Sequence, residues 1–428
     1  MKKILSFLIV AATIYFVACN VEEETISQTR ELPTKNPYAI SIPQAIERLN
    51  AIFPDVAKTT RTTIANVETL TRADFGLTTR AVNGALPTDP LIYIIPTDNN
   101  GCAIVGADRR MEAVYAVLDN STLTAEDILG IETRSDSQNE EDGAEIKEFV
   151  STMLNDAITY NARLVGTGDS YPPTDEEYDT MIVALKVSPL LRTKWHQKKP
   201  FSYCFPAQFC HRTGCGPLAV AQILYYHRQP EYIMDISKPF LWDSIAMCEY
   251  GNNSVNYINN HSVQASRFIW EIAQIMKAKP NGAGVGVTEE GILNIIKLTQ
   301  FRDNADVIPY DGNRVIEMLN QNLPIYITGG NEDRMGHAWV IDGYEYREYY
   351  NKLTSTTFVG CKDPETYVHC NYGQEGYCDG YYLNGVFDFT ELRSGENLET
   401  SIGDKVPIIV NTKPYTLDLK ILYYLSIY

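Results

Sequence analysis

The sequence predicts an α+β protein with a small N-terminal unit and a larger C-terminal domain. From about residue 180 onward, helical patterns come first and strand-like runs come later, which indicates two subdomains with a cleft between them. Before that point, one amphipathic helix and three apolar strands form a smaller unit that ends near residue 128. With 428 residues, 44% of them hydrophobic, the chain is long enough for two or three domains and a sizeable core.

The first residues have the pattern of an export signal. Lys2 and Lys3 precede an apolar stretch of 14 residues, 4–17, which suits a signal peptide better than a membrane span. Ala18 before Cys19 resembles a bacterial lipoprotein box, in which the cysteine is lipidated and becomes the mature N-terminus; Phe16 departs from its usual leucine. The acidic run 20–24 is either a solvated linker or a surface-export signal, and a diacyl anchor would hold the protein to a membrane.

Elements of the N-terminal unit follow the polar residues 20–38. Ser41 can cap a helix over 41–53, because apolar residues recur there at helical spacing. Residues 91–96 and 102–106 are predicted strands around the turn 97–101, and 114–118 is a third.

The chain between the two parts is acidic and then helical. Residues 132–148 are predicted to form an exposed loop, and the spacing of Ile146, Phe149, Val150, Met153, Leu154 and Ile158 predicts an amphipathic helix. The run 167–173 interrupts the pattern again, so a protease could reach either segment.

The C-terminal domain has helical patterns at 215–227 and 266–278 and strand-like runs at 324–328, 338–341, 380–383 and 406–410. The glycine-rich run 282–286 lacks the preceding strand and the spacing of a nucleotide-binding loop, so a flexible loop is expected there.

Cys215 stands at the start of a predicted helix, followed by Gly216 and Pro217. Proline suits the first turn of a helix, and a thiol at that position faces the positive end of the helix dipole, which favours the thiolate. The thiolate is the nucleophile in cysteine enzymes, and it needs a base within hydrogen-bond reach. Of six histidines, His337 has the most suggestive setting, between Gly336 and a short apolar strand, whereas His227 at the far end of the Cys215 helix is expected to be structural.

Several segments, in order, resemble the streptopain family of cysteine peptidases. They are the Trp-x-Gln element in 190–197, the run 213–230 around Cys215, the run 336–344 around His337, and the runs 369–373 and 379–383. The first 130 residues resemble the inhibitory propeptide of that family, including the strand pair near Ile94 and Ile104.

The resemblance implies a papain-like domain at 180–428, with a helical half and an antiparallel β half. It also implies a lipoprotein signal peptide at 1–18, a tether at 19–38, a propeptide domain at 39–130 and an acidic linker with a connecting helix at 131–179. Cys215 would be the nucleophile and His337 the base. Gln197 would help to bind the oxyanion together with the Cys215 N–H, and Asn371 would orient the imidazole.

The chain departs from the family pattern in three places. Gly216-Pro217 replaces a small β-branched residue, Tyr372 replaces a tryptophan that shelters the His–Asn contact, and 346–367 is an insertion expected near the cleft.

Composition narrows the ligands and partners. The net charge of −18, without a basic stripe, argues against nucleic acid. No cofactor is expected, and the lack of a Cys-x-x-Cys pair argues against zinc. Nine cysteines are present, and the six besides Cys19, Cys102 and Cys215 allow 15 disulfide pairings or remain buried thiols.

Three functions fit these features. The first is an exported, lipid-anchored cysteine endopeptidase that cuts protein substrates and is made as a precursor inhibited by its own propeptide. The second is an acyltransferase that uses the same Cys–His chemistry, and the third is a surface lipoprotein that uses a peptidase fold for binding.

Overall fold

The computed structural model describes residues 36–54, 56, 64–78, 85–97, 100–131, 141–166, 180–229, 239–248, 258–281, 284–298, 305–331, 334–352, 358–387 and 419–424. The predicted signal peptide, Cys19, nearly all of the predicted tether and the run 406–410 lie outside the described residues.

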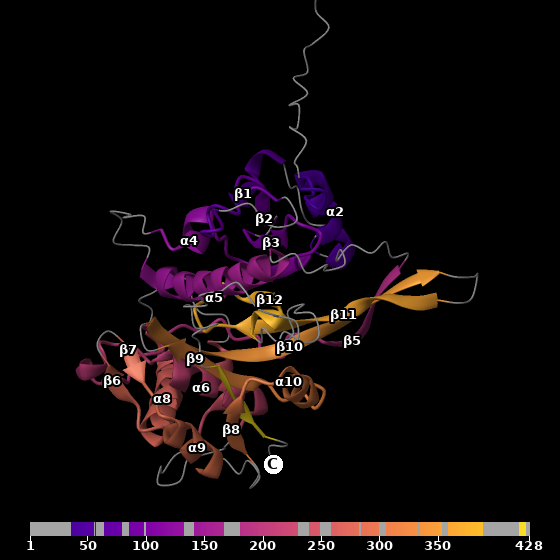
Figure 1. Ribbon diagram of the computed structural model, residues 1–428. Helices are drawn as coiled ribbons and strands as arrows, with labels where there is room; N and C mark the ends of the chain where they lie inside the picture. Colours follow the sequence, from indigo (N-terminus) through magenta and orange to yellow (C-terminus); the bar gives the residue numbers. More distant parts are fainter. Residues whose placement is uncertain are drawn as a thin grey trace, which may run out of the picture.

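An N-terminal unit forms the top of the molecule in Figure 1. Its helix α2 (Ile42–Ile52) starts at Ser41, whose backbone N–H donates to the Gln44 side chain at 2.8 Å. The strands β1 (Glu68–Thr71), β2 (Pro90–Pro96), β3 (Cys102–Gly106) and β4 (Val114–Leu118) pair in order as an antiparallel meander, followed by α4 (Ala125–Leu129). The short 3₁₀ helix η1 (Ile64–Asn66) precedes β1. The predicted helix and the three predicted strands are confirmed.

Helix α5 (Glu141–Gly166) lies between this unit and the rest of the molecule (Figure 1). It begins earlier than expected, so residues 141–148 are helical and the prediction of an exposed loop is wrong for them. Tertiary packing explains the difference, because Ile146, Val150, Met153 and Leu154 are all buried on one face.

The helical half surrounds α6 (Cys215–His227), which is buried along almost its whole length. Around it lie η2 (Ala207–Phe209), α7 (Trp242–Ala246), α8 (Asn260–Ile275), the hairpin of β6 (Lys279–Asn281) and β7 (Gly284–Gly286), and α9 (Glu289–Leu298). The helix predicted at 266–278 therefore starts and ends earlier. The glycine-rich run contributes a strand, because Gly286 and Val285 pair with Lys279 and Pro280.

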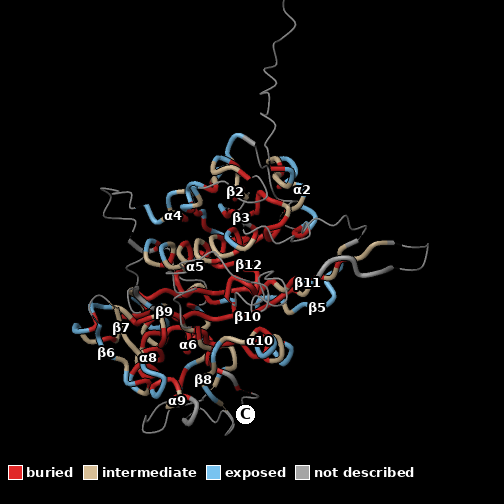
Figure 2. Tube along the Cα trace, in the orientation of Figure 1, coloured by how far each residue is buried: buried red, intermediate tan, exposed pale blue. Residues whose placement is uncertain are grey.

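The β half is one antiparallel sheet that continues into the N-terminal unit. Its other strands are β8 (Asp306–Pro309), β9 (Ile325–Asn331), β10 (Arg334–Lys352), β11 (Phe358–Asn371), β12 (Gly380–Leu383) and β13 (Lys420–Tyr423), with α10 (Gly312–Leu319) and η3 (Asn384–Val386) beside them. In the described part the order is β1-β2-β3-β4-β12-β11-β10-β9-β13-β8. The two units join where Gly380, Tyr381 and Tyr382 of β12 pair with Leu118, Val117 and Ala116 of β4. The expected α+β class, with a helical half against an antiparallel half, is confirmed, and Figure 2 shows buried residues where α6 meets β9 and β10 and also in the strands of the N-terminal unit.

The insertion lengthens β10 and β11 into an arm that projects from the body (Figure 1). On the arm, β5 (Thr180–Val187) pairs with residues 344–350 of β10. Tyr350 follows His337 by thirteen positions, or about 43 Å of extended strand. The expectation that the insertion lies near the cleft is therefore wrong for most of its length.

Within the described residues, none of the helices combines the length and the apolar character needed to cross a membrane.

A buried ion pair joins the two central strands. His369 on β11 holds Asp342 on β10 through Nδ1 and Oδ1 at 2.6 Å, and the other Asp342 oxygen accepts the Leu191 N–H at 2.9 Å. Burial lowers the pKa of His369, but Asp342 and then Asp119 outweigh burial and raise it from 6.5 to about 10.

We expect this ion pair to make stability fall with rising pH. Between pH 6.5 and about 10 the folded chain keeps the His369 proton that the unfolded chain loses, so the contribution is complete below pH 6.5 and disappears toward pH 10. Urea unfolding across this range should show a shallower decline for His369→Gln than for the unsubstituted protein. His261→Gln, at an exposed histidine bonded to Ser244, is the control and should keep the original slope. Parallel slopes for all three proteins would contradict the assignment.

Candidate active site

Cys215 is the first residue of α6, and a glycine sets its position. Gly214, the N-cap, has φ 80°, in the left-handed region. A Cβ added to Gly214 would lie 2.6 Å from Cβ of Val285, so β7 packs directly against the residue before the nucleophile. The helix start predicted from the sequence is confirmed.

The Cys215 thiol is half-buried, and its charge state differs from the expectation. Desolvation by the surrounding protein raises the pKa of the thiol above 9.0, although the backbone N–H groups of Ala338 and Gly216 act in the opposite direction. In this covered state burial therefore outweighs the helix start, and the prediction of a favoured thiolate is wrong.

His337 lies on β10, directly before Ala338, whose N–H faces the thiol. Its Nε2 is 3.1 Å from the carbonyl oxygen of Tyr372. Burial lowers the pKa of His337 to about 4, so the imidazole is neutral at ordinary pH and Nε2 donates to this carbonyl. The tautomer leaves Nδ1 without its proton. In the described part no hydrogen bond joins the His337 ring to the Cys215 thiol, so the two groups are neighbours that are not yet paired.

Asn371 is buried beside the site without reaching His337. Its side-chain N–H donates to the Thr193 carbonyl at 2.9 Å, and its side-chain oxygen accepts the Gly373 N–H at 3.1 Å. In this structure the carbonyl of Tyr372 makes the contact with the imidazole. Any residue could supply this backbone carbonyl, so the sequence gives no signal for the contact between Tyr372 and His337.

Gln197 is held next to the nucleophile segment through its backbone. Its carbonyl accepts the Thr213 N–H at 2.9 Å, two residues before Cys215, and its side chain is buried. Trp195 anchors the same segment, because its indole N–H donates to the Cys248 carbonyl at 2.9 Å. Gln197 and Cys215 are thus brought together from separate segments.

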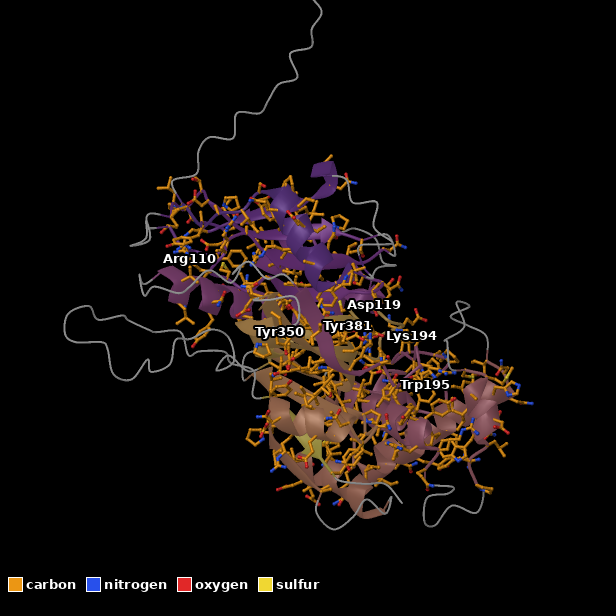
Figure 3. All side chains as sticks on the ribbon, turned by 90° about the vertical axis from the view of Figure 1, so that its right-hand side faces the viewer. Arg110, Asp119, Lys194, Trp195, Tyr350 and Tyr381 are labelled. Atoms are coloured by element: carbon orange, nitrogen blue, oxygen red, sulfur yellow. The ribbon has the colours of Figure 1, made fainter. Side chains whose placement is uncertain are left out.

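Asp379 supports the Tyr372 contact, a role that sequence reasoning missed. It is buried, and its carboxylate accepts the Tyr372 N–H at 2.9 Å and pairs with Lys194 Nζ at 2.7 Å. Lys194 directly precedes Trp195, and Figure 3 shows both on the same stretch of chain. Asp379 therefore links the segment of Gln197 to the peptide that holds His337.

Helix α5 covers this site. The Phe149 ring lies 5.5 Å from the His337 ring and 5.3 Å from the Trp339 ring, measured between centroids. One turn earlier, Glu145 forms an ion pair with Arg212 at 2.9 Å. Glu145 and Phe149 are four residues apart on one helix face, a spacing visible in the sequence without any sign of what that face contacts.

The described residues show no metal site and no disulfide. They contain no cluster of three or more His, Cys, Asp or Glu side chains that could hold a metal ion. The seven cysteines whose side chains are described are free thiols, and Cys102, Cys248, Cys370 and Cys378 are buried.

The fold and the site define a class: an α+β protein that places a helix-start cysteine beside a strand histidine. The model of the Peptidase C10 family matches residues 195–382, a range that contains Gln197, Cys215, His337 and Asn371. The match confirms the resemblance to the streptopain peptidases over these residues.

Two solved structures are similar to this chain. One is a prointerpain A fragment from Prevotella intermedia, with 20% sequence identity, 68% of this chain and 88% of that chain covered, and a TM-score of 0.46. The other is the active wild-type interpain A cysteine protease of the same organism, with 23% identity, 49% and 89% covered, and a TM-score of 0.35. The comparison with curated proteins finds no matching sequence.

We expect Gly214→Ala to lower the free energy of unfolding by about 3 kcal/mol. A left-handed φ costs a residue with a Cβ about 1–2 kcal/mol, and the overlap with Val285 adds about 1–3 kcal/mol. Gly130→Ala is the matched control, because Gly130 has φ 65° but open space around it, so about 1 kcal/mol is expected there. Chemical denaturation measures both, and equal losses would contradict a close approach of β7 to α6.

Asp379→Ala should be strongly destabilising, by about 3 kcal/mol, because it leaves the Tyr372 N–H and the Lys194 ammonium without their buried partner. Asp243→Ala removes an exposed carboxylate that pairs with Arg228, and should cause no measurable loss. The same unfolding measurement decides the point, and an Asp379→Ala protein as stable as Asp243→Ala would refute it.

Proposed function

We propose that this protein is a cysteine endopeptidase made as an inactive precursor. One observation carries the proposal: within the Peptidase C10 segment, the thiol at the start of α6 meets β10 at the residue after His337. The acyltransferase and the binding protein remain outcomes of the experiment below.

In the proposed reaction, His337 Nδ1 accepts the proton of Cys215 while the Tyr372 carbonyl holds Nε2–H. The thiolate attacks the scissile carbonyl, and the Cys215 N–H and the Gln197 side chain stabilise the oxyanion. His337 then gives its proton to the leaving amine. Water hydrolyses the thioester, with His337 again acting as the base.

The charge states support latency of the covered form. Catalysis needs a proton to pass from Cys215 to His337, but burial raises the pKa of the thiol and lowers the pKa of the imidazole to about 4. Both shifts favour the neutral pair. Phe149 on the His337 ring and the Glu145–Arg212 ion pair hold α5 over these groups, so the segment before residue 180 would act as the inhibitor.

We also propose that the chain is exported and anchored by a lipid on Cys19. The sequence pattern of residues 1–19 supports this proposal. A Cys19→Ala protein expressed in a Gram-negative host should lose incorporation of labelled palmitate and leave the membrane fraction. Unchanged labelling would contradict the anchor.

Alkylation of Cys215 tests the enzymatic proposal. In the full chain iodoacetamide should modify Cys215 slowly, because the thiol is covered and protonated. After the chain is cut between α5 and β5 and the N-terminal part is removed, modification should accelerate at least about tenfold, as a lower thiol pKa requires. Cys210, an exposed free thiol, is the internal control and should react equally in both forms.

Casein hydrolysis by the cut protein should be lost in Cys215→Ala. Transfer to an added amine in place of hydrolysis would favour the acyltransferase. A cut protein that alkylates Cys210 but not Cys215, and leaves casein intact, would favour the binding protein.

A further inference from the structure

The insertion has a contact that the proposed peptidase reaction does not use. Arg347, on β10 near the base of the arm, is 2% exposed, and its guanidinium donates to the carbonyl oxygen of Ile52, the last residue of α2. The guanidinium also lies 3.8 Å from the centre of the Phe53 ring. A cation is favourable at the C-terminal end of a helix, and over an aromatic face.

Side chains of the sheet strands β5, β10, β11 and β12 form the rest of this contact. The Phe53 ring packs edge-on against Tyr367 of β11, with centroids 4.9 Å apart, and lies 6.3 Å from the ring of Tyr381 on β12. Arg347 also pairs with Glu345, which a second cation, Lys186 of β5, approaches to 2.5 Å. Burial raises the pKa of Glu345, but the two cations outweigh it and the net shift is downward, so the carboxylate stays charged.

This cradle, defined as Arg347, Tyr367 and Tyr381, is separate from the site. Arg347 follows His337 by ten positions along β10, or about 33 Å of strand. The cradle therefore does not cover Cys215, whereas α5 does. Figure 3 shows Tyr381 with Asp119 at the boundary between the N-terminal unit and the sheet.

Losing α2 from the cradle would be costly. The buried guanidinium would lose the Ile52 carbonyl and the Phe53 ring together, and three aromatic rings would lose their packing. Arg347 would keep its ion pair with Glu345, but the apolar faces of the three rings would be exposed to water, so the empty cradle favours rebinding.

We propose that the cradle is a docking surface for the C-terminal end of α2, and that it keeps the N-terminal unit bound after the connecting segment has been cut. The proposal rests on the proposed function, since it concerns the precursor of that peptidase. Its occupant is the N-terminal unit of this chain, which is recognised by the carbonyl of Ile52 at the end of α2 and by the aromatic ring of Phe53 that follows it. Cleavage and release are then separate steps, and Arg347 sets the rate of the second.

A double-mutant cycle on the full chain tests this. The chain carries Cys215→Ala and a recognition sequence for a site-specific protease inserted after Pro172, and its C-terminal end is fixed to a sensor surface. After cutting, the loss of mass gives the dissociation rate of the N-terminal part. Phe53→Leu and Arg347→Met are measured singly and together, because a shared contact appears as non-additivity.

Each single substitution should raise the dissociation rate at least about tenfold, and the double substitution should raise it no further than the larger single one. Tyr38→Leu is the control: Arg110 lies 4.1 Å from the Tyr38 ring, a similar contact wholly within the N-terminal unit, so its loss should leave the rate unchanged.

The proposal would be overturned if the effects of Phe53→Leu and Arg347→Met on the dissociation rate multiply. An equal rise of the dissociation rate in Tyr38→Leu would overturn it too. So would immediate dissociation of the N-terminal part from the cut protein that carries neither substitution. Because the protein carries Cys215→Ala, these outcomes are independent of whether Cys215 is a nucleophile.

Discussion

The contact between the first turn of α6 and the strand β10 is the constraint on which the rest of this structure depends. The same turn of α6 also packs against Val285 and Val287, because Gly214 and Gly216 leave room for these side chains and a Cβ on either glycine would crowd them. The contact with β10 places the Cys215 thiol at the N–H of Ala338, and His337 is the preceding residue of the same strand. Polar contacts fix the segments around this point. Asn371 donates a hydrogen bond to Thr193, Asp379 accepts one from Tyr372 and forms an ion pair with Lys194, and His369 forms an ion pair with Asp342.

Burial decides the state in which these groups are held. Proton transfer from the thiol to the imidazole needs surroundings that stabilise the charged pair. The covered site instead raises the pKa of the thiol and lowers the pKa of the imidazole, so it favours the neutral pair. Moving α5 would bring water to the thiol and the imidazole at once. The same displacement would therefore open the cleft to a substrate and shift both pKa values toward the charged pair. In the proposed precursor, coverage by Phe149 and its helix accounts for latency without a displaced catalytic residue.

Local signals predicted much of the fold, and tertiary contacts account for most of what was missed. Helix α2 was predictable because Ser41 and Gln44 form a capping box and Leu49 repeats the apolar spacing. Strand β13 was not, because residues 420–423 form a strand only where β8 and β9 leave an edge for them. In the site, Cys215, His337 and Gln197 are side-chain signals, whereas the acceptor on His337 is a backbone carbonyl of Tyr372, which any residue could supply.

The continuity of the sheet bears on how such a precursor can mature. The N-terminal unit is joined to the C-terminal domain by the pairing of β4 with β12, by α5 over the site, and by α2 on Arg347. Cutting the chain after α5 removes none of these contacts. The cut removes the covalent link, so the two parts no longer have the high effective concentration that the connecting segment imposed. Backbone pairing of β12 is insensitive to sequence, so a sheet edge alone would accept other extended segments once it is free. The Arg347 cradle adds side-chain selectivity to that edge. The base of the arm thus forms part of the interface with the N-terminal unit, at a distance along β10 from the residues of the proposed cleft.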